Sequence, residues 1–156
     1  MARLIFMLVA ILGMFQTLAA PLRSRAATDA QCNSFNVQAS VGITSALLSL
    51  GTINNGKDVV DATNILQAQL SLVNANNAIT QIDVSEFGET PAPADVNSQV
   101  LSGIQAALTF LSKVPIAILP DNSTVSAIVN ATSFATSAQQ GAQQLLDANC
   151  SSAKGA

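Results

Sequence analysis

Apolar residues recur at intervals of three and four positions in four stretches of the chain, which is the spacing of amphipathic helices. This spacing predicts helices over about residues 31–50, 57–82, 95–113 and 121–149. The apolar seams of the first two are Cys32, Phe35, Ala39, Ile43, Ala46 and Leu50, then Ile65, Ala68, Leu72, Ala75, Ile79 and Ile82. Period-two alternation, which marks a half-buried strand, is never sustained. The sequence therefore predicts an all-α fold.

Turn-forming residues separate the four predicted helices. Gly51 follows the first helix, where a C-cap glycine is favoured, and begins the turn sequence GTINNG. The longest predicted loop, DVSEFGETPAPAD at 83–95, contains a glycine and two prolines. Asp95 is a predicted N-cap of the third helix, and Asp121 or Asn122 opens the fourth. The apolar connector VPIAILP joins these last two helices.

The two cysteines, Cys32 and Cys150, lie near opposite ends of the predicted helical region. In an antiparallel bundle with short connections, an even number of helices returns the end of the last helix to the side where the first begins. Four helices bring the cysteines together, whereas three or five hold them a helix length apart, beyond the roughly 7 Å limit for bridged Cα atoms. The sequence predicts an antiparallel four-helix bundle whose termini are joined by one disulfide. Two free buried thiols are the alternative.

The N-terminal residues predict export from the cell. Residues 1–19 combine a positive start, the apolar run LIFMLVAILGMF and small residues before the end, which is the layout of a secretory signal peptide. Residues 20–25 are a candidate pro-segment, and 26–156 then form a single helical domain. An N-terminal membrane anchor is the alternative. No other stretch reaches the roughly 18 apolar residues of a spanning helix, so we expect a soluble, extracellular mature protein that is not integral to a membrane.

Two sequons agree with export. Asn122 in NST and Asn130 in NAT are N-glycosylation acceptors. The sequence NCS at Asn149 also fits formally, but its cysteine is the one expected to form the bridge. The first two sequons are predicted to be glycosylation sites on a eukaryotic secretory route.

Charge and composition exclude several classes of function. Removal of residues 1–25 leaves three lysines against nine acidic side chains, a net charge of −6. Three scattered lysines cannot neutralise a run of phosphates, so we expect no nucleic-acid binding. The chain has no His, Trp or Tyr, which removes the commonest general base and metal ligand and the Ser-His-Asp and Cys-His arrangements. We expect no catalytic residues, no metal and no cofactor.

Two pairs of acidic residues are the remaining candidates for chemistry. Asp58 and Asp61 share one face of the second predicted helix, but the helix dipole alone favours acids in a first turn. Glu86 and Glu89 lie in the long predicted loop and lack the spacing of an EF-hand calcium site. We interpret both pairs as solvated charges.

Several apolar residues fall outside the predicted core seams. Val37, Val41 and Leu48 form a second stripe on the first helix, away from the seam that contains Ile43 and Leu50. These three residues are a candidate apolar interaction surface or the lining of a lipid-sized cavity between helices. The alternative is that they cover one another in a compact bundle. The connector adds four residues to the candidate surface: Pro115, Ile116, Ile118 and Leu119.

The second predicted helix carries two apolar seams side by side. Besides the seam that contains Leu72, another includes Leu66, Leu70 and Val73. A helix this broadly apolar must touch two neighbours or leave one side exposed.

A secretory signal, a short chain without Trp, Tyr or His, and helices rich in Ala, Ser, Thr, Asn and Gln are similar to the small secreted proteins of fungi. Among these, the segments DVVDATNILQAQLSLVNANNAI and NSQVLSGIQAALTFLSKVPIAI resemble the hydrophobic-surface-binding and cell-wall galactomannoprotein family. The resemblance implies a role in coating or adhering to apolar surfaces and the cell wall. The terminal cysteine pair departs from that family. Small secreted proteins as a class imply effector or signalling roles.

These features together predict a secreted, non-enzymatic interaction protein, either an effector or a surface-active protein of the fungal exterior. Its expected partner is an unidentified protein, an apolar surface or a lipid. One alternative is a carrier that holds a sterol or fatty acid within the bundle. A dry cavity of a few hundred Å³ would favour the carrier, and a fully packed core would contradict it. Another alternative, by fold-level analogy, is an inhibitor of a secreted enzyme.

Overall fold

The computed structural model describes residues 29–53, 62–87, 95–119, 121–148 and 150. These residues form four α-helices: α2 (Asp29–Gly51), α3 (Ala62–Phe87), α4 (Val96–Ser112) and α5 (Asn122–Asp147). A short 3-10 helix, η1 (Ile116–Ile118), lies in the connector between α4 and α5. The described residues contain no strand, so the predicted all-α fold is confirmed. The predicted signal peptide (1–19) and pro-segment (20–25) lie outside them.

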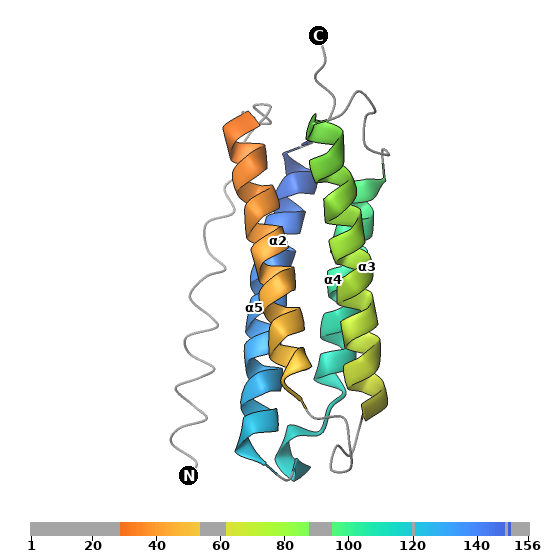
Figure 1. Ribbon diagram of the computed structural model, residues 1–156, viewed down its shortest axis with the longest axis vertical. Coiled ribbons are helices and arrows are strands. Elements are labelled where there is room, and N and C mark those ends of the chain that lie inside the picture. Colours follow the sequence, from red (N-terminus) through yellow and green to blue (C-terminus); the bar gives the residue numbers. More distant parts are fainter. Residues whose placement is uncertain (1–28, 54–61, 88–94, 120, 149, 151–156) are drawn as a thin grey trace.

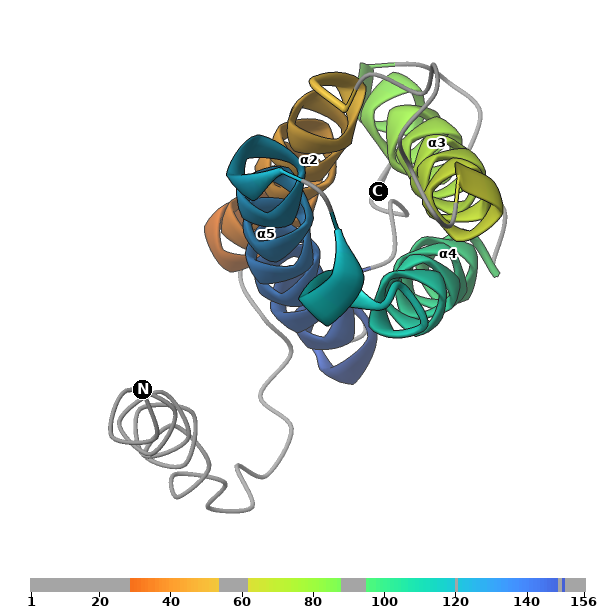
Figure 2. The same ribbon diagram turned by 90° about the horizontal axis from the view of Figure 1, so that it is seen from below.

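The four helices alternate in direction and form an antiparallel bundle (Figure 1). Seen along the bundle axis, α2 neighbours α3 and α5, and α4 neighbours the same two helices (Figure 2). The end where α2 begins and α5 ends is called the disulfide pole, and the opposite end is called the connector pole. The α2–α5 and α3–α4 interfaces are the largest, and the α2–α3 interface is the smallest of the four. The predicted four-helix bundle is therefore confirmed.

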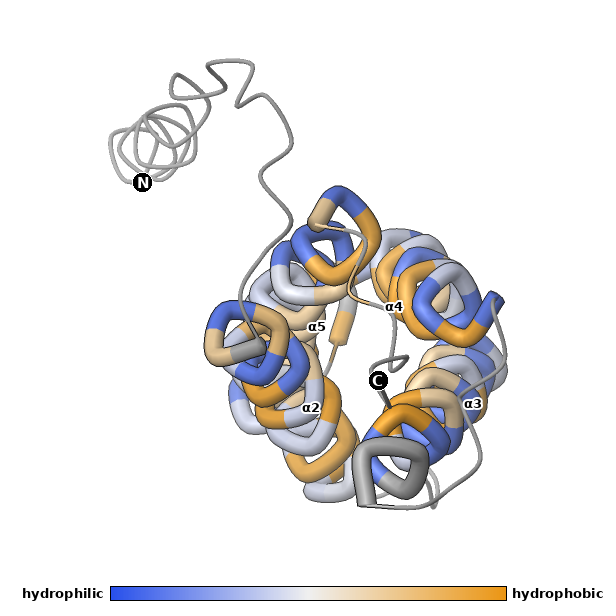
Figure 3. The backbone as a smooth tube through the Cα atoms, turned by 90° about the horizontal axis from the view of Figure 1, so that it is seen from above, coloured by the Kyte–Doolittle hydropathy of each residue, from blue (hydrophilic) through white to orange (hydrophobic). Residues whose placement is uncertain are grey.

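The predicted apolar seams form the core. Apolar positions recur among polar ones along each helix (Figure 3), and the helix period places them on one side. Full burial of a Val, Leu or Ile side chain stabilises the fold by about 1.5–3 kcal/mol. The largest side chains with less than 2% exposed surface come from all four helices: Ile43, Leu50, Ile65, Leu72, Ile79, Val100, Ile104, Ile128 and Leu145.

Two helix ends differ from the sequence prediction. The α3 helix continues to Phe87, past its predicted end at residue 82, because no glycine or proline interrupts it before Gly88. Gly51 is the last residue of α2 and does not adopt the left-handed conformation of a C-cap glycine. The predicted start of the second helix, residues 57–61, lies outside the described residues.

Two glycines allow α2 and α5 to approach closely. A Cβ atom added to Gly42 would lie 2.8 Å from the backbone nitrogen of Ala138 and 2.8 Å from the carbonyl oxygen of Phe134. A Cβ atom added to Gly141 would lie 2.8 Å from the backbone nitrogen of Ala39. Because these neighbours are backbone atoms, the two helices would have to move apart to admit any side chain.

Substitution of Gly42 tests this close approach. We expect Gly42→Ala to lower the free energy of unfolding by about 1–3 kcal/mol, because the added methyl group overpacks the α2–α5 interface. Gly51→Ala is the matched control, since a Cβ atom at Gly51 meets nothing within 4 Å. That control should raise the free energy of unfolding by about 0.5–1 kcal/mol through backbone entropy. Urea unfolding followed by circular dichroism measures both, and equal effects would contradict the packing.

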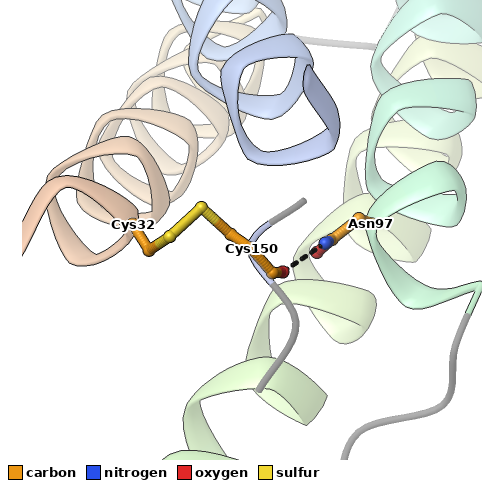
Figure 4. Close-up of a disulfide and its surroundings, with 3 residues drawn as sticks. All are labelled: Cys32, Asn97 and Cys150. Carbon is orange, nitrogen blue, oxygen red and sulfur yellow. Dashed lines mark hydrogen bonds between the residues drawn. A yellow bond between two sulfur atoms is a disulfide. The ribbon is translucent and has the colours of Figure 1, made fainter. Parts of the chain in front are cut away.

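A disulfide joins Cys32, in the first turn of α2, to Cys150, which follows α5 (Figure 4). The two Cα atoms lie 5.6 Å apart, which is the usual separation for bridged cysteines. The backbone N–H of Cys150 donates to the carbonyl oxygen of Leu145, and Asn97 Nδ2 on α4 donates to the carbonyl oxygen of Cys150 at 2.7 Å. The predicted bridge is confirmed, and it fixes the end of α5 to α2.

Removal of the bridge should lower stability without changing the fold class. The two cysteines are 118 residues apart. We expect replacement of both by alanine to lower the free energy of unfolding by about 3–5 kcal/mol, because the unfolded chain regains the entropy of a long loop. Urea unfolding of the variant and of reduced wild-type protein should give the same loss. A variant as stable as the oxidised wild type would contradict this expectation.

Candidate interaction surface

The outer face of α2 carries an exposed apolar row. The side chains of Val37, Val41 and Leu48 are 53%, 58% and 69% exposed. With 3.6 residues per turn, these positions lie on the side of the helix opposite Ile43 and Leu50, which are fully buried. The structure therefore places the three predicted residues together, outside the core.

A second exposed apolar row lies on α3. Leu66, Leu70 and Val73 are 42–50% exposed and follow one another at spacings of four and three, so they share one side of the helix. The second apolar seam that the sequence shows on this helix is thus left uncovered. Because α2 and α3 are neighbours, the two rows lie on the outer faces of adjacent helices. These six residues are called the outer apolar rows below.

The helix surfaces between the two poles carry no charged residue. The ranges 30–53, 62–82, 96–112 and 122–146 contain no Asp, Glu, Lys or Arg, and their exposed polar residues are Ser, Thr, Asn and Gln. Burial of an unpaired charge is very costly, so a surface without charges can be covered by an apolar material at little electrostatic cost. The described charged side chains lie near the helix ends: Asp83, Asp95 and Asp147 at the disulfide pole, Lys113 and Asp121 at the connector pole.

The connector contributes less apolar surface than the sequence predicts. Ile116 is exposed and Pro115 is half-buried, as expected for a surface segment. Leu119 packs against the hydrophobic core instead, because the connector crosses the end of the bundle between α4 and α5 and covers core side chains there (Figure 2). Leu119 is half-buried and therefore contributes only part of its side chain to the candidate surface. The side chain of Ile118 lies outside the described part of the structure.

Both sequons have exposed asparagines on α5. Asn122 is the first residue of the helix, and Asn130 lies within it. In the first sequon, Thr124 is buried and its backbone N–H and hydroxyl each donate to the carboxylate of Asp121 at 2.7 Å. The hydroxyl of Ser123 also donates to this carboxylate. The Ser and Thr side chains of the sequence NST thus take part in the N-terminal cap of α5. Glycosylation of Asn122 or Asn130 stays a prediction.

The two predicted N-cap aspartates differ in geometry. Asp121 caps α5, and the hydrogen bonds from Ser123 and Thr124 lower the pKa of Asp121 from 3.8 to about 2. Asp95 occupies the N-cap position of α4, but its side chain accepts no backbone N–H of that helix. Its carboxylate instead accepts a hydrogen bond from Gln99 Nε2 at 2.7 Å. Only Asp121 is therefore confirmed as a capping side chain.

Stability should depend on the ionisation of Asp121 in acid. A carboxylate whose pKa is lower in the folded chain stabilises the fold above its ordinary pKa and loses that contribution as the pH falls through the folded value. The window for Asp121 runs from about pH 4 down to about pH 2. Asp121→Asn keeps an acceptor at the cap but does not titrate. The difference in urea midpoint between wild type and Asp121→Asn should shrink across this window, and a constant difference would contradict the prediction.

Two asparagines at the disulfide pole, each with a buried side-chain oxygen, were not singled out from the sequence. Asn36 is 4% exposed, and its Nδ2 donates to the Asp83 carboxylate on α3 at 2.6 Å. Asn97 Nδ2 donates to Cys150, and within the described part of the chain the Oδ1 atoms of both asparagines are buried and accept no hydrogen bond. The available signal was position: Asn36 lies one turn after Cys32 on the core side of its helix, where a polar residue needs a partner.

Neither a metal centre nor a membrane-spanning helix is found in the described part of the chain. Among the described residues, no group of three His, Cys, Asp or Glu side chains could hold a metal ion. No described helix combines the length and the apolar character that crossing a membrane requires. Comparisons of the chain with protein-family profiles, curated proteins and solved structures find no match. The candidate site therefore rests on the geometry of the bundle itself.

Proposed function

We propose that the protein is a secreted, non-enzymatic protein that adsorbs to uncharged apolar surfaces through its outer apolar rows. One observation carries the proposal: six exposed Val and Leu side chains lie on two neighbouring helices, α2 and α3, whose surface between the poles has no charged residue. Contiguous exposed apolar residues of this kind mark interaction sites in soluble proteins. The disulfide is compatible with an oxidising, extracellular location.

Adsorption depends on the summed free energy of covering all six exposed residues, because each residue alone contributes little. Covering a half-exposed Val or Leu gains roughly 1 kcal/mol, about half the value for full burial. Association costs at least about 4 kcal/mol in lost freedom of the molecule. One row alone is therefore marginal, and both rows are needed for stable adsorption. A flat apolar surface can contact both rows because they lie on neighbouring helices.

The core weighs against the carrier as an alternative. A cavity wide enough for a fatty acid or sterol would leave accessible surface on the side chains that line it. In the described core, the inward-facing residues of all four helices, including Ile43, Leu72, Ile104 and Ile128, have almost no accessible surface. We therefore place the apolar contact of this protein on the outside of the bundle. The fungal exterior and its wall, suggested by the resemblance, are the proposed location of that contact.

Adsorption to hydrophobic beads tests the proposal. We expect Val41→Asp and Leu48→Asp each to weaken binding roughly tenfold or more, because each loses apolar burial and brings a charge to the contact. Gln105→Asp on α4 is the matched control: it adds the same charge at an exposed position of a helix that has no exposed large apolar residue. Binding of the wild type should change little with salt concentration, since no charged residue takes part.

Two results would contradict the proposed surface. Binding by Val41→Asp and Leu48→Asp that equals the wild type would remove the α2 row from the contact. Equal weakening by all three variants would show that net charge controls binding, and not the position of the apolar rows. Circular dichroism of each variant should show the helix content of the wild type.

A further inference from the structure

The four helices form two tightly packed pairs. Gly42 and Gly141 bring the backbones of α2 and α5 together. Gly103 does the same for α4 and α3, since a Cβ atom added there would lie 2.9 Å from the Cβ atom of Ala75 and 3.0 Å from the carbonyl oxygen of Ser71. The α2–α3 interface between the pairs is much smaller than either interface within a pair. The bundle is therefore most easily separated along the α2–α3 boundary.

The covalent connections divide in the same way. At the disulfide pole, the Cys32–Cys150 bridge joins α2 to α5, and the chain from Phe87 to Val96 joins α3 to α4. The connection from α2 to α3 begins and ends at the connector pole, as does the connection from α4 to α5 (Figure 1). At the disulfide pole, the bridge joins α2 to α5 and the chain joins α3 to α4. Neither of these two links joins α2 to α3.

A hydrogen bond holds α2 to α3 at this unlinked end. Asn36 Nδ2 donates to the Asp83 carboxylate across the boundary at 2.6 Å. The same asparagine is almost fully buried, and its Oδ1 atom accepts no hydrogen bond from the described residues. A buried acceptor without a partner destabilises the closed arrangement, and separation of the helices would expose it to water. On the other side of the bundle, Asn97 ties α4 to Cys150 (Figure 4).

We propose that the bundle opens along the α2–α3 boundary, from the disulfide pole, when its outer apolar rows rest on an interface between water and liquid hydrocarbon. This inference rests on the proposed function and names the partner as a hydrocarbon–water interface. The rows lie on the two helices that share the smallest of the four interfaces, so adsorption through both rows turns the α2–α3 side of the bundle toward the hydrocarbon. Opening then moves inner side chains such as Ile43 and Leu72 from the core onto hydrocarbon, and their apolar burial is retained.

Opening in this manner preserves the strongest contacts of the protein. The close α2–α5 and α3–α4 contacts, the disulfide and the hydrogen bonds within each helix all remain. The segments of all four helices between the poles contain no charged residue, so no charge has to lose its hydration at the interface. The product is a layer four helices wide in place of a bundle two helices wide.

Thiol labelling at hexadecane droplets tests the opening. Val100 on α4 is fully buried near the disulfide pole, and cysteine is a small apolar residue of similar size. We expect a hexadecane-soluble maleimide, supplied in the droplets, to label Val100→Cys roughly tenfold faster on droplets than in solution, because opening turns a protected group onto the hydrocarbon that carries the reagent. Leu70→Cys, which lies in the outer apolar row on α3 and contacts the hydrocarbon whether or not the bundle opens, is the control for reagent access. The helical circular dichroism signal should be retained on the droplets.

Each outcome of this experiment separates the two proposals. An adsorbed protein whose Val100→Cys thiol stays unreactive would overturn the opening and leave the proposed function standing. A protein that does not adsorb would overturn both. Fast labelling with loss of the helical signal would show surface denaturation and would also overturn the opening. If Val100→Cys does not fold, Ala107→Cys, fully buried on the same helix, provides the same measurement.

A second disulfide across the α2–α3 boundary tests the proposal from the opposite direction, because it should prevent the opening. Asn36→Cys combined with Asp83→Cys places two thiols where the side chains of α2 and α3 now meet. The oxidised protein should still adsorb but should occupy roughly half the interfacial area per molecule, because packed helices lie about 8–10 Å apart and the layer narrows from four helices to two. The same variant with these two thiols alkylated is the control. Equal areas for the two forms would overturn the opening.

Discussion

The bond between Cys32 and Cys150 requires the first helix of the bundle to begin where the last one ends, and the rest of the architecture depends on this requirement. Only an even number of antiparallel helices satisfies it, so the bond and the helix count support each other. It also places the start of α2 beside the end of α5. Gly42 and Gly141 then allow these two helices to pack with their backbones in close contact.

Close packing of one helix pair has a consequence for the surface. Helices that approach at glycine and alanine leave their larger side chains to point elsewhere, toward the core or toward solvent. On α2, Ile43 and Leu50 point inward, whereas Val41 and Leu48 are exposed. The apolar rows are thus a product of a sequence with more apolar residues than a four-helix core can bury. The exposed polar residues between the poles are therefore hydroxyl and amide side chains, since the helix segments there carry no charges.

The sequence could predict those parts of the structure that repeat with the helix period. The seams through Ile43 and Leu72 and the exposed position of Leu48 follow from spacing alone, and the two cysteines fix the number of helices. Features that depend on contacts between helices could not be predicted in this way. The pairing of Asn36 with Asp83 needs the relative register of α2 and α3, which no periodicity contains. The packing of Leu119 against the core likewise depends on the path of the connector.

The end of α3 and the arrangement of surface charge also could not be predicted fully from residue patterns. The extension of α3 to Phe87 was missed because the acidic residues after Ile82 do not by themselves end a helix, and the first helix-breaking residue is Gly88. The sequence alone shows that the helix segments between the poles contain no charged residue. Its meaning emerges only when the helices are placed side by side, because four separate neutral stretches then become one continuous neutral surface.

Because the described charges are confined to the two poles, the electrostatic repulsion between two copies depends on the direction from which they approach each other. Two molecules that meet at their disulfide poles bring Asp83, Asp95 and Asp147 of each copy together. Two molecules that approach flank to flank meet no like charges along most of their length. Crowded copies therefore resist contact between their disulfide poles and tolerate dense lateral alignment, which is the packing of a continuous film one molecule thick.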